Sequence, residues 1–473
     1  WSSDVCSSDL MGISSLGVGS SILTQDVLDQ LREADEAGQI EPITLDIANE
    51  NDKKDAMDVI DASMTNFIDI INDVKSQSLY DERVTEVSGT AAEVIAAANT
   101  DIQDFTLSVN VLATKQIEES GAFASEDILV ATAAGTMELN VDGEAFSIAY
   151  DTTTTLKDLK ALINEEAGDK VDATIVQINS GEFRLFISSV DTGTNQDITL
   201  ADTSGFLSDD GGTTAGGVNL TTAMTAIQSG VDAEFTFNGQ AISRSSNRVE
   251  DLISGLDITL KETGTSVVSV SQNRDNIMTK LDSFVEKYNS SIAELDRMTK
   301  PSADSDKGIF SSESTIKNMK RAIESMFGSV GGGVGRMADF GFDVDRDGRM
   351  TLDKDVLNST MDDNSKNIEA FFSGGTFTNS DASTTEVDGV FTEMSAIVEG
   401  YTEYNATLNQ FSTSIVDRIS DLEDRKITAT ERLDARYEIL KKQFAAYDLM
   451  INKYNSASSM FSEIVAADNN NNN

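Results

Sequence analysis

The residues with the clearest chemical pattern are the carboxylates Asp343, Asp345 and Asp347, which are followed at once by Gly348. This spacing matches the start of an EF-hand loop, which binds Ca²⁺ through carboxylate oxygens and turns sharply at the glycine. The last position of such a loop falls on Lys354, where Ca²⁺ binding requires a bidentate Glu. We therefore expect a β-hairpin that turns at this glycine, and no metal site.

Two other patterns with possible chemistry are weaker. The carboxylate pairs Glu165-Glu166 and Asp362-Asp363 resemble glycosidase acid and base pairs, but a chain with 81 acidic residues contains such pairs by chance. The glycine-rich residues 331–336 lack the Gly-Lys-Ser/Thr ending of a phosphate-binding loop. Because the sequence has no histidine and one cysteine, it cannot form a Ser-His-Asp or Cys-His pair. We expect no catalytic residue, no enzymatic activity and no cofactor.

Composition excludes two classes of partner. The 473-residue chain carries a formal net charge of −46, which is spread along its length and repels nucleic-acid phosphates and anionic lipid. No window is apolar over the roughly 18 residues that a membrane span needs. We therefore expect neither nucleic acid nor a membrane as a partner.

Residues 1–10 differ from the rest of the chain, because they hold the only Trp and the only Cys and end just before Met11. We interpret them as a non-native leader. The remaining sequence then has no disulfide and no zinc site of the usual type that would resist unfolding. The Asn-rich residues 468–473 are expected to be disordered.

Near both ends, apolar residues recur at alternating steps of three and four, the spacing of a coiled-coil seam. A short N-terminal seam contains Met57, Ile60, Met64, Phe67, Ile71 and Val74. The C-terminal seams contain Met394, Ile397, Tyr401, Tyr404, Leu408, Phe411, Ile415, Ile419 and Leu422, then Leu433, Tyr437, Leu440, Phe444, Tyr447, Ile451, Tyr454 and Phe461. We expect these residues to serve helix packing or oligomerisation, with the N-terminal seam as the first partner of the C-terminal ones. An ordinary amphipathic core helix is the alternative for the N-terminal seam.

Between these regions the pattern changes to short alternating runs rich in Thr, Val, Ile and Phe. Two runs align without gaps and predict β-hairpins that turn at Asp142-Gly143 and Asn238-Gly239. Each precedes a segment expected to be helical, residues 156–163 and 249–253, which indicates an internal repeat. A further helix over residues 277–295 should end near Pro301, because proline disfavours helical backbone at the residue before it.

Segments in order along the chain resemble the flagellar hook-associated protein 2 family, the FliD-type filament caps. The first are the glycine-rich opening at residues 12–20, a strand-to-helix segment at 105–116, and a module at 156–200 similar to one shared by flagellins and hook-associated proteins. Later ones are residues 235–239 (Phe-Thr-Phe-Asn-Gly), 255–260 (Gly-Leu-Asp-Ile-Thr-Leu), 284–289, 308–310, 340–343 and Gln443-Phe444. Together they extend over nearly all of residues 11–465.

The resemblance and the patterns together predict an α+β multi-domain fold with paired N- and C-terminal coiled-coil helices, a helical body and two β-rich head lobes. The expected parts are a flexible N-terminal leg (11–45), the first part of the helical body (46–119), a head lobe with the flagellin-type module (120–207), a second head lobe (208–275), the second part of the body (276–424) and a C-terminal leg helix (425–467). The glycine-rich residues 208–217 should link the lobes flexibly.

The resemblance also implies a function. Members of the family form ring-like homo-oligomers, commonly pentamers, at the distal tip of the bacterial flagellum, and promote the folding and insertion of exported flagellin. The implied partners are other copies, flagellin, hook-associated proteins, the flagellar export apparatus and an export chaperone, and the implied secretion route is flagellar type III export. Alternatives are a hook-filament junction protein or minor flagellin, or an adhesin that binds host glycans through the head lobes.

Overall fold

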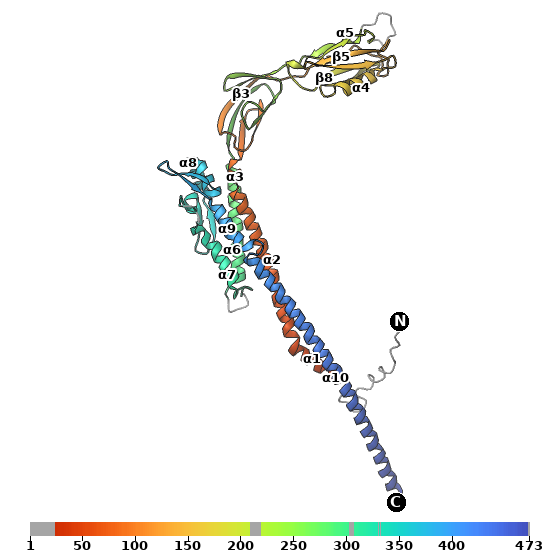
Figure 1. The fold of residues 1–473 in the computed structure, drawn as a ribbon, viewed down its shortest axis with the longest axis vertical. Coiled ribbons are helices and arrows are strands. Elements are labelled where there is room, and N and C mark those ends of the chain that lie inside the picture. Colours follow the sequence, from red (N-terminus) through yellow and green to blue (C-terminus); the bar gives the residue numbers. More distant parts are fainter. Residues whose placement is uncertain (1–23, 209–218, 302–306, 330, 332, 472–473) are drawn as a thin grey trace. The chain divides into compact units, whose positions relative to one another are not determined.

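The computed structural model describes residues 24–208, 219–301, 307–329, 331 and 333–471 (Figure 1). The chain forms two compact units: unit 1 comprises Trp1–Ser76 and Met278–Asn473, and unit 2 comprises Gln77–Ile277. The expected leader, residues 11–23 of the expected leg and nearly all of the expected lobe linker lie outside the described residues.

Unit 1 is built mainly from helices, whose ends follow from local sequence (Figure 1). The helices are α1 (Gln25–Gln39), α2 (Glu41–Lys75), α6 (Arg274–Thr299), α7 (Ser314–Ser329), α8 (Lys354–Ser373), α9 (Val390–Thr402) and α10 (Thr407–Asn471). The Thr24 hydroxyl accepts a hydrogen bond from the Val27 amide at 3.3 Å and so caps α1. Pro42 lies in the first turn of α2, where its missing N–H is tolerated. Pro301 follows the end of α6, as the sequence predicts.

Aromatic rings from several helices fill the core of unit 1. Phe67 of α2 stacks on Phe284 of α6 with ring centroids 5.7 Å apart. Phe284 meets Phe391 of α9 edge-on at 4.9 Å, and Phe391 lies 5.2 Å from Phe372 of α8. Because aromatic side chains bury large areas, this cluster holds α2, α6, α8 and α9 together.

The EF-hand-like segment is a β-hairpin, as expected. Its strands β16 (Phe342–Val344) and β17 (Met350–Leu352) pair antiparallel. The Asp345 carboxylate accepts hydrogen bonds from the Asp347 and Arg349 amides, at 2.9 and 2.8 Å, and so closes the turn. The Asn289 side chain of α6 bonds both the carbonyl and the amide of Met350, at 2.9 and 2.7 Å, which fixes the hairpin on the helix.

The structure corrects three expectations for the C-terminal half of unit 1. The seam over residues 394–422 is not one helix, because Asn405 has a left-handed φ of +62° and Tyr404 is 88% exposed between α9 and α10. Part of the expected helical body is instead a second hairpin, β18 (Gly375–Thr378) with β19 (Thr384–Val387). Finally, α10 continues to Asn471 and so includes most of the Asn-rich residues for which we expected disorder.

Unit 2 contains the short helix α3 (Gln77–Asp81) and two β-rich lobes. Lobe A, residues 83–113 and 231–272, packs a five-stranded sheet against a three-stranded one. The strand order in the five-stranded sheet is β1 (Arg83–Ser88), β15 (Gly264–Gln272), β3 (Gln103–Val111), β11 (Ala233–Phe237), β12 (Gln240–Arg244). The order in the three-stranded sheet is β13 (Arg248–Val249), β14 (Leu256–Leu260), β2 (Ala92–Ala96). Alternate residues such as Phe105 and Leu107 of β3 share one buried cluster with Ile258 of β14.

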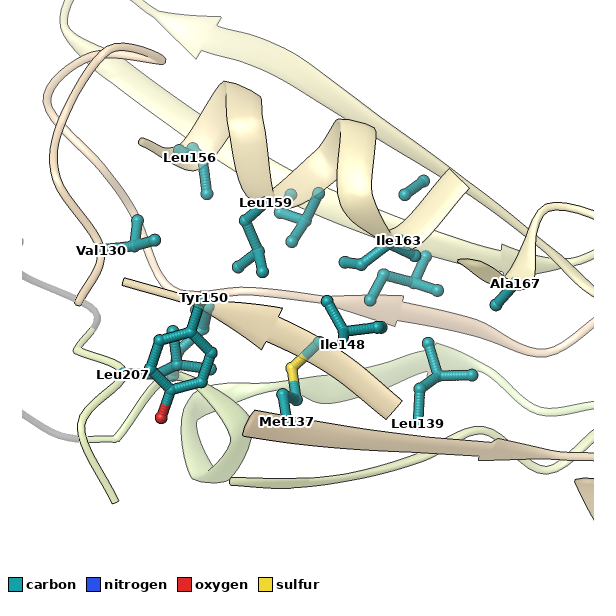
Figure 2. Close-up of a cluster of buried hydrophobic side chains, with 14 of the residues drawn as sticks. Val130, Met137, Leu139, Ile148, Tyr150, Leu156, Leu159, Ile163, Ala167 and Leu207 are labelled. Atoms are coloured by element: carbon teal, nitrogen blue, oxygen red, sulfur yellow. The ribbon is translucent and has the colours of Figure 1, made fainter. Parts of the chain in front are cut away.

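Lobe B, residues 116–228, has its own core beneath a helix. Its four-stranded sheet has the order β10 (Thr225–Gln228), β4 (Ile117–Glu119), β8 (Glu182–Ser189), β7 (Val171–Asn179). Its three-stranded sheet has the order β6 (Glu144–Tyr150), β5 (Gly135–Val141), β9 (Thr199–Asp202). The lobe also contains the helices α4 (Leu156–Ala167) and α5 (Leu220–Ala223). A capping box between Thr155 and Asp158 begins α4. Figure 2 shows Leu159 and Ile163 of α4 pointing toward the strands that carry Ile148.

The two predicted hairpin turns are confirmed. Asp142 and Gly143 have φ of +54° and +74°, and Asn238 and Gly239 have φ of +47° and +83°, as tight hairpin turns require. The repeat is only partial, however. α4 follows the first hairpin, whereas residues 249–253 form the end of β13 and bends, and are not helical.

The predicted boundaries around the lobes are wrong. The helical body does not reach residue 119, because β1 begins at Arg83 and β3 leads into β4 without an intervening helix. The second lobe does not begin at residue 208, because β10 pairs with β4 of lobe B. Lobe A instead joins two distant stretches of chain through the pairing of β3 with β11 and β15.

Close polar contacts join the two lobes where the chain passes between them. The Thr192 hydroxyl of lobe B donates to the Ser245 carbonyl of lobe A at 2.6 Å. The Asp232 carboxylate of lobe A accepts a hydrogen bond from the Thr194 amide at 2.7 Å. A Cβ at Gly193, whose φ is +114°, would lie 2.7 Å from the Cβ of Ser245. Glycine is therefore needed at this approach.

Candidate assembly surface on the terminal helices

The N-terminal seam residues are buried inside unit 1. Met57, Ile60, Met64, Phe67 and Ile71 of α2 are all at most 1% exposed. Phe67 packs on α6. Two polar contacts join the same helices: Ser63 of α2 lies 3.0 Å from Ser291 of α6, and Lys280 of α6 donates to Asp73 of α2 at 2.7 Å. The seam therefore packs on α6, while α2 as a whole also contacts α9 and α10, and the part of the seam in oligomerisation stays a prediction.

The first C-terminal seam residues are also packed. Leu408 and Ile415 of α10 are 1% and 4% exposed, and Phe411 is half-buried with its ring 5.8 Å from that of Phe310. Arg418 of α10 lies 3.5 Å from the carboxylate of Glu50 on α2. The Glu50 side chain is only 8% exposed, and Lys53 on its own helix, at 2.9 Å, is its closer cationic partner.

Further along α10, a small apolar cluster joins it to α1. Its buried members are Leu28, Leu433 and Tyr437, and half-buried Ile40, Leu440 and Phe444 pack against them. Leu440 and Phe444 are seam residues that the sequence predicts for packing. Leu28 was not among the predicted packing residues, although it is an apolar residue one helical turn after Thr24, which caps α1.

Charged groups flank this cluster and match across the two helices. The Tyr437 hydroxyl donates to the Asp35 carboxylate at 2.8 Å, and Arg436 lies 3.1 Å from the same carboxylate. Burial and this hydrogen bond raise the pKa of Tyr437. Arg32 bonds Glu36 on its own helix and Asp434 on α10, and these two carboxylates raise its pKa. Opposite charges thus face each other across α1 and α10 beside the apolar cluster.

Beyond Phe444 the apolar spacing of the seam continues and most of its residues are exposed, although Asp448 beside them is only 2% exposed. Tyr447 and Tyr454 are 57% and 77% exposed, whereas Ile451 between them is half-buried. The other exposed apolar residues on this end of α10 are Leu449, Met450, Met460, Phe461, Ile464 and Val465. In Figure 1, α10 extends past the end of α1. This exposed seam is the candidate assembly surface, and the packed seam residues hold α10 on the rest of unit 1.

The described residues show little that could do chemistry. Among them, no group of three or more Asp, Glu, Cys or His side chains is placed to hold a metal ion. No helix in the described part of the chain is long and apolar enough to span a membrane. The geometry of the terminal helices is suited to binding other helices.

Comparison with known proteins shows which family has this arrangement. A family profile described as flagellar hook-associated protein 2 N-terminus matches residues 20–116, and one described as flagellar hook-associated protein 2 C-terminus matches residues 230–456. Together they cover more than half of the chain, including α1, α2, lobe A and α10 as far as Ser456. The chain belongs to the flagellar hook-associated protein 2 family.

Individual members of the hook-associated protein 2 family match over different lengths. The flagellar hook-associated protein 2 of Helicobacter pylori strain J99 is 31% identical over 256 residues, which are 51% of this chain and 37% of that protein. The Campylobacter jejuni protein is 26% identical over 76% of this chain and 64% of its own length. The chain thus spans between a third and two thirds of these relatives. The Escherichia coli K12 protein is 24% identical over 96% of this chain and 98% of its length.

A solved member of the hook-associated protein 2 family shares the fold. The D1-D2-D3 domains of the flagellar cap protein FliD from Escherichia coli align with a TM-score of 0.58 at 21% identity. They cover 76% of this chain and 99% of the solved one. The expected α+β architecture is therefore confirmed, and the comparisons do not favour a junction protein or a minor flagellin.

Proposed function

We propose that this protein is a flagellar filament cap, which assembles as a homo-oligomer at the distal tip of the flagellum and promotes the folding and insertion of exported flagellin. Family membership and the shared fold with a flagellar cap protein support this proposal. The observation that carries it is the exposed seam of α10, because an apolar stripe with heptad spacing is stable only when another helix covers it.

The proposed mechanism is steric and needs no catalysis. The terminal helices bind the filament end through the exposed seam, and the lobes of unit 2 form the cover beneath which flagellin folds. A sequence without histidine and with one cysteine supports a role without catalysis. Hook-associated proteins, the export apparatus and an export chaperone complete the proposed partners, and the flagellar export channel is the proposed route out of the cell.

The test is a pair of substitutions on the exposed seam. Tyr447→Asp with Tyr454→Asp places two charges on it while leaving the fold intact, because both side chains are more than half exposed. Asn452→Asp with Ser456→Asp is the matched control, since it adds the same charge at exposed polar positions of the same turns.

We expect the seam variant to stop swimming in a strain that lacks the native gene, and to release monomeric flagellin into the medium. The control variant should restore filaments of normal length. If the seam variant also restores motility and filament length, the exposed seam is not the filament-binding surface and the proposal fails.

A further inference from the structure

Three helices of this protein hold the edge of a strand through the same side-chain contact. In each contact one asparagine uses both ends of its amide: Nδ2 donates to the carbonyl of a strand residue, and Oδ1 accepts from the backbone amide of that residue. The pairs are Asn164 of α4 with Ala173 of β7, Asn289 of α6 with Met350 of β17, and Asn367 of α8 with Thr378 of β18. All these distances lie between 2.7 and 2.9 Å, and we call each contact an asparagine clamp. Asn247, in a bend of lobe A, makes the same pair of bonds to Ala113.

The clamp on β7 occupies backbone groups that point away from the sheet. β7 is the last strand of the four-stranded sheet of lobe B, next to β8. The Val190 amide donates to the Lys170 carbonyl at 2.8 Å, so Lys170 bonds on the side of β8. Because backbone groups alternate in direction along an antiparallel strand, those of Ala173 point to the free edge. The Asn164 amide therefore lies where the next strand of the sheet would lie.

The two clamps in unit 1 bind free edges in the same way. Each of the hairpins β16–β17 and β18–β19 is a two-stranded sheet, so each of its strands has one free edge. The Asp345 amide bonds the Arg349 carbonyl across the first hairpin at 2.9 Å, so Met350, the next residue, points outward. The Asn379 amide bonds across the second hairpin at 2.8 Å, so Thr378 points outward.

A clamp leaves little of the β7 edge free. The outward backbone groups of this strand belong to Val171, Ala173, Ile175 and Gln177. A shift of register after Gln177 ends the regular edge. The clamp takes Ala173 out of this run, so that only Ile175 and Gln177 follow one another. An added strand bonds at successive outward residues, and this edge is therefore too short to hold one.

An unclamped edge would accept extended chains of many sequences. Addition of a strand depends mainly on backbone hydrogen bonds, which every extended chain offers, and free edges are therefore sites of unwanted pairing. The asparagine amide has a donor and an acceptor, as a peptide group of a neighbouring strand has. A clamp thus satisfies the edge, and the helix that carries the asparagine lies beside it.

We propose that the asparagine clamps keep these edges closed, so that extended chains of exported flagellin do not add to the sheets of this protein as further strands. This inference rests on the proposed function, since it concerns the unfolded chain that folds beneath the cap. It gives Asn164, Asn289 and Asn367 a positioning role, because they hold α4, α6 and α8 against the edges.

Removal of one clamp from the full-length protein tests the proposal. Asn164→Ala removes the clamp from β7. The matched control is Asn179→Ala on the same strand, because the Asn179 side chain bonds the Glu182 carboxylate at 2.9 Å and holds no edge. A third variant combines Asn164→Ala with Thr174→Lys. Thr174 is exposed next to Ala173, and a lysine on an edge strand opposes the addition of a further strand.

Fluorescence anisotropy with labelled flagellin gives the outcome. One probe is flagellin freshly diluted from urea, and the other is folded flagellin. We expect Asn164→Ala to bind the unfolded probe at least about tenfold more tightly than the native chain does, with no gain for the folded probe. The control should bind like the native chain, and Thr174→Lys should cancel the gain. Lost stability alone would not be cancelled in this way, because the lysine adds no contact that stabilises the fold.

Asn367→Ala serves as a second variant if Asn164→Ala does not fold. Thr378 is exposed, so its freed backbone groups bond water and the loss of the clamp is tolerated. Thr376→Lys is the matching edge charge, since Thr376 is exposed on the same strand.

The inference is overturned if the clamp variants bind the unfolded probe no more tightly than the native chain does. It is also overturned if the lysine leaves the gained binding unchanged, or if the control gains as much as Asn164→Ala. These results leave the cap proposal standing, because that proposal depends on the exposed seam of α10 and on its own swimming assay.

Discussion

Leu28→Ala tests how α1 is held on α10. Leu28 is 3% exposed and is the buried residue that α1 contributes to the cluster with Leu433 and Tyr437. Its replacement removes most of the apolar contact between the two helices. The polar contacts of Arg32 and Asp35 remain, but exposed ion pairs contribute only about 0–1 kcal/mol each.

The loss of free energy in Leu28→Ala, and the part of unit 1 that it affects, follow from the packing around Leu28. Leu to Ala substitutions in a well-packed core cost about 2.7–5.0 kcal/mol, and the small cluster around Leu28 should give about 2–3 kcal/mol. Because the aromatic core around Phe67 and Phe284 is separate, this loss should affect the docking of α1 and not the folding of the rest of unit 1. At 1.4 kcal/mol per factor of ten, the open state of α1 becomes roughly 30- to 150-fold more populated.

Hydrogen exchange measures this population directly. Peptides from α1 in Leu28→Ala should exchange faster by that factor, while peptides from α6 keep the native rate. Leu31→Ala is the control, because Leu31 lies on the same helix and is 47% exposed. Unchanged exchange of α1 would show that the cluster does not hold it. Equal acceleration in α6 would show that α1 and the body unfold as one unit.

Two further predictions concern unit 2. Gly193→Val should loosen the junction between the lobes and lower the unfolding free energy of unit 2 by more than about 1 kcal/mol in urea titrations, because its Cβ would lie 2.7 Å from that of Ser245. Burial alone raises the pKa of Asp202, but hydrogen bonds from Tyr150 and from the Leu207 amide outweigh it and hold that pKa below its ordinary value. The carboxylate therefore stabilises the fold above the ordinary pKa and loses this effect as pH falls through the lower folded-state pKa. Asp202→Asn should lower urea stability near neutral pH, and the difference from the native chain should shrink only as the pH falls below about 4.

Features set by local sequence could be predicted. The turns at Asn238-Gly239 and at Gly348 need the left-handed backbone conformations that Asn and Gly favour. The amino-acid types at these positions were therefore enough to place the turns. The end of α6 before Pro301 follows in the same way. The helices α2 and α10 follow from apolar periodicity, which reports one buried face.

Pairing between distant residues could not be predicted. Lobe A places β3 beside β11 and β15, more than a hundred residues away in sequence, and alternation along a strand does not identify its neighbour. The break at Asn405 was missed because the apolar spacing continues across it. Periodicity depends only on which residues are apolar, so it gives no sign of the left-handed φ at Asn405.

The candidate site shows the same limit. Phe67 and Tyr454 occupy equivalent seam positions by spacing, yet Phe67 is fully buried and Tyr454 is 77% exposed. A coiled-coil seam predicts that a helix packs on a partner. Whether that partner lies in the same chain depends on the lengths of the neighbouring helices. The cluster that joins α1 to α10 runs from Leu433 to Phe444, so the structure was required to separate the covered part of the seam from the exposed part.

Burial along α10 places the requirement for a partner at one end of the helix. Leu408 and Leu433 are 1% and 2% exposed, whereas Tyr447, Tyr454 and Phe461 range from 57% to 77%. Tyr447, Tyr454 and Phe461 are spaced seven residues apart and so lie on one face of α10. A partner that covers all three must be an extended helix aligned with α10. Each aromatic ring can bury about 150–250 Å², whereas the lobes of unit 2 already have complete cores of their own. The free energy of assembly should therefore come mainly from α10, and a change in lobe B should leave filament binding intact.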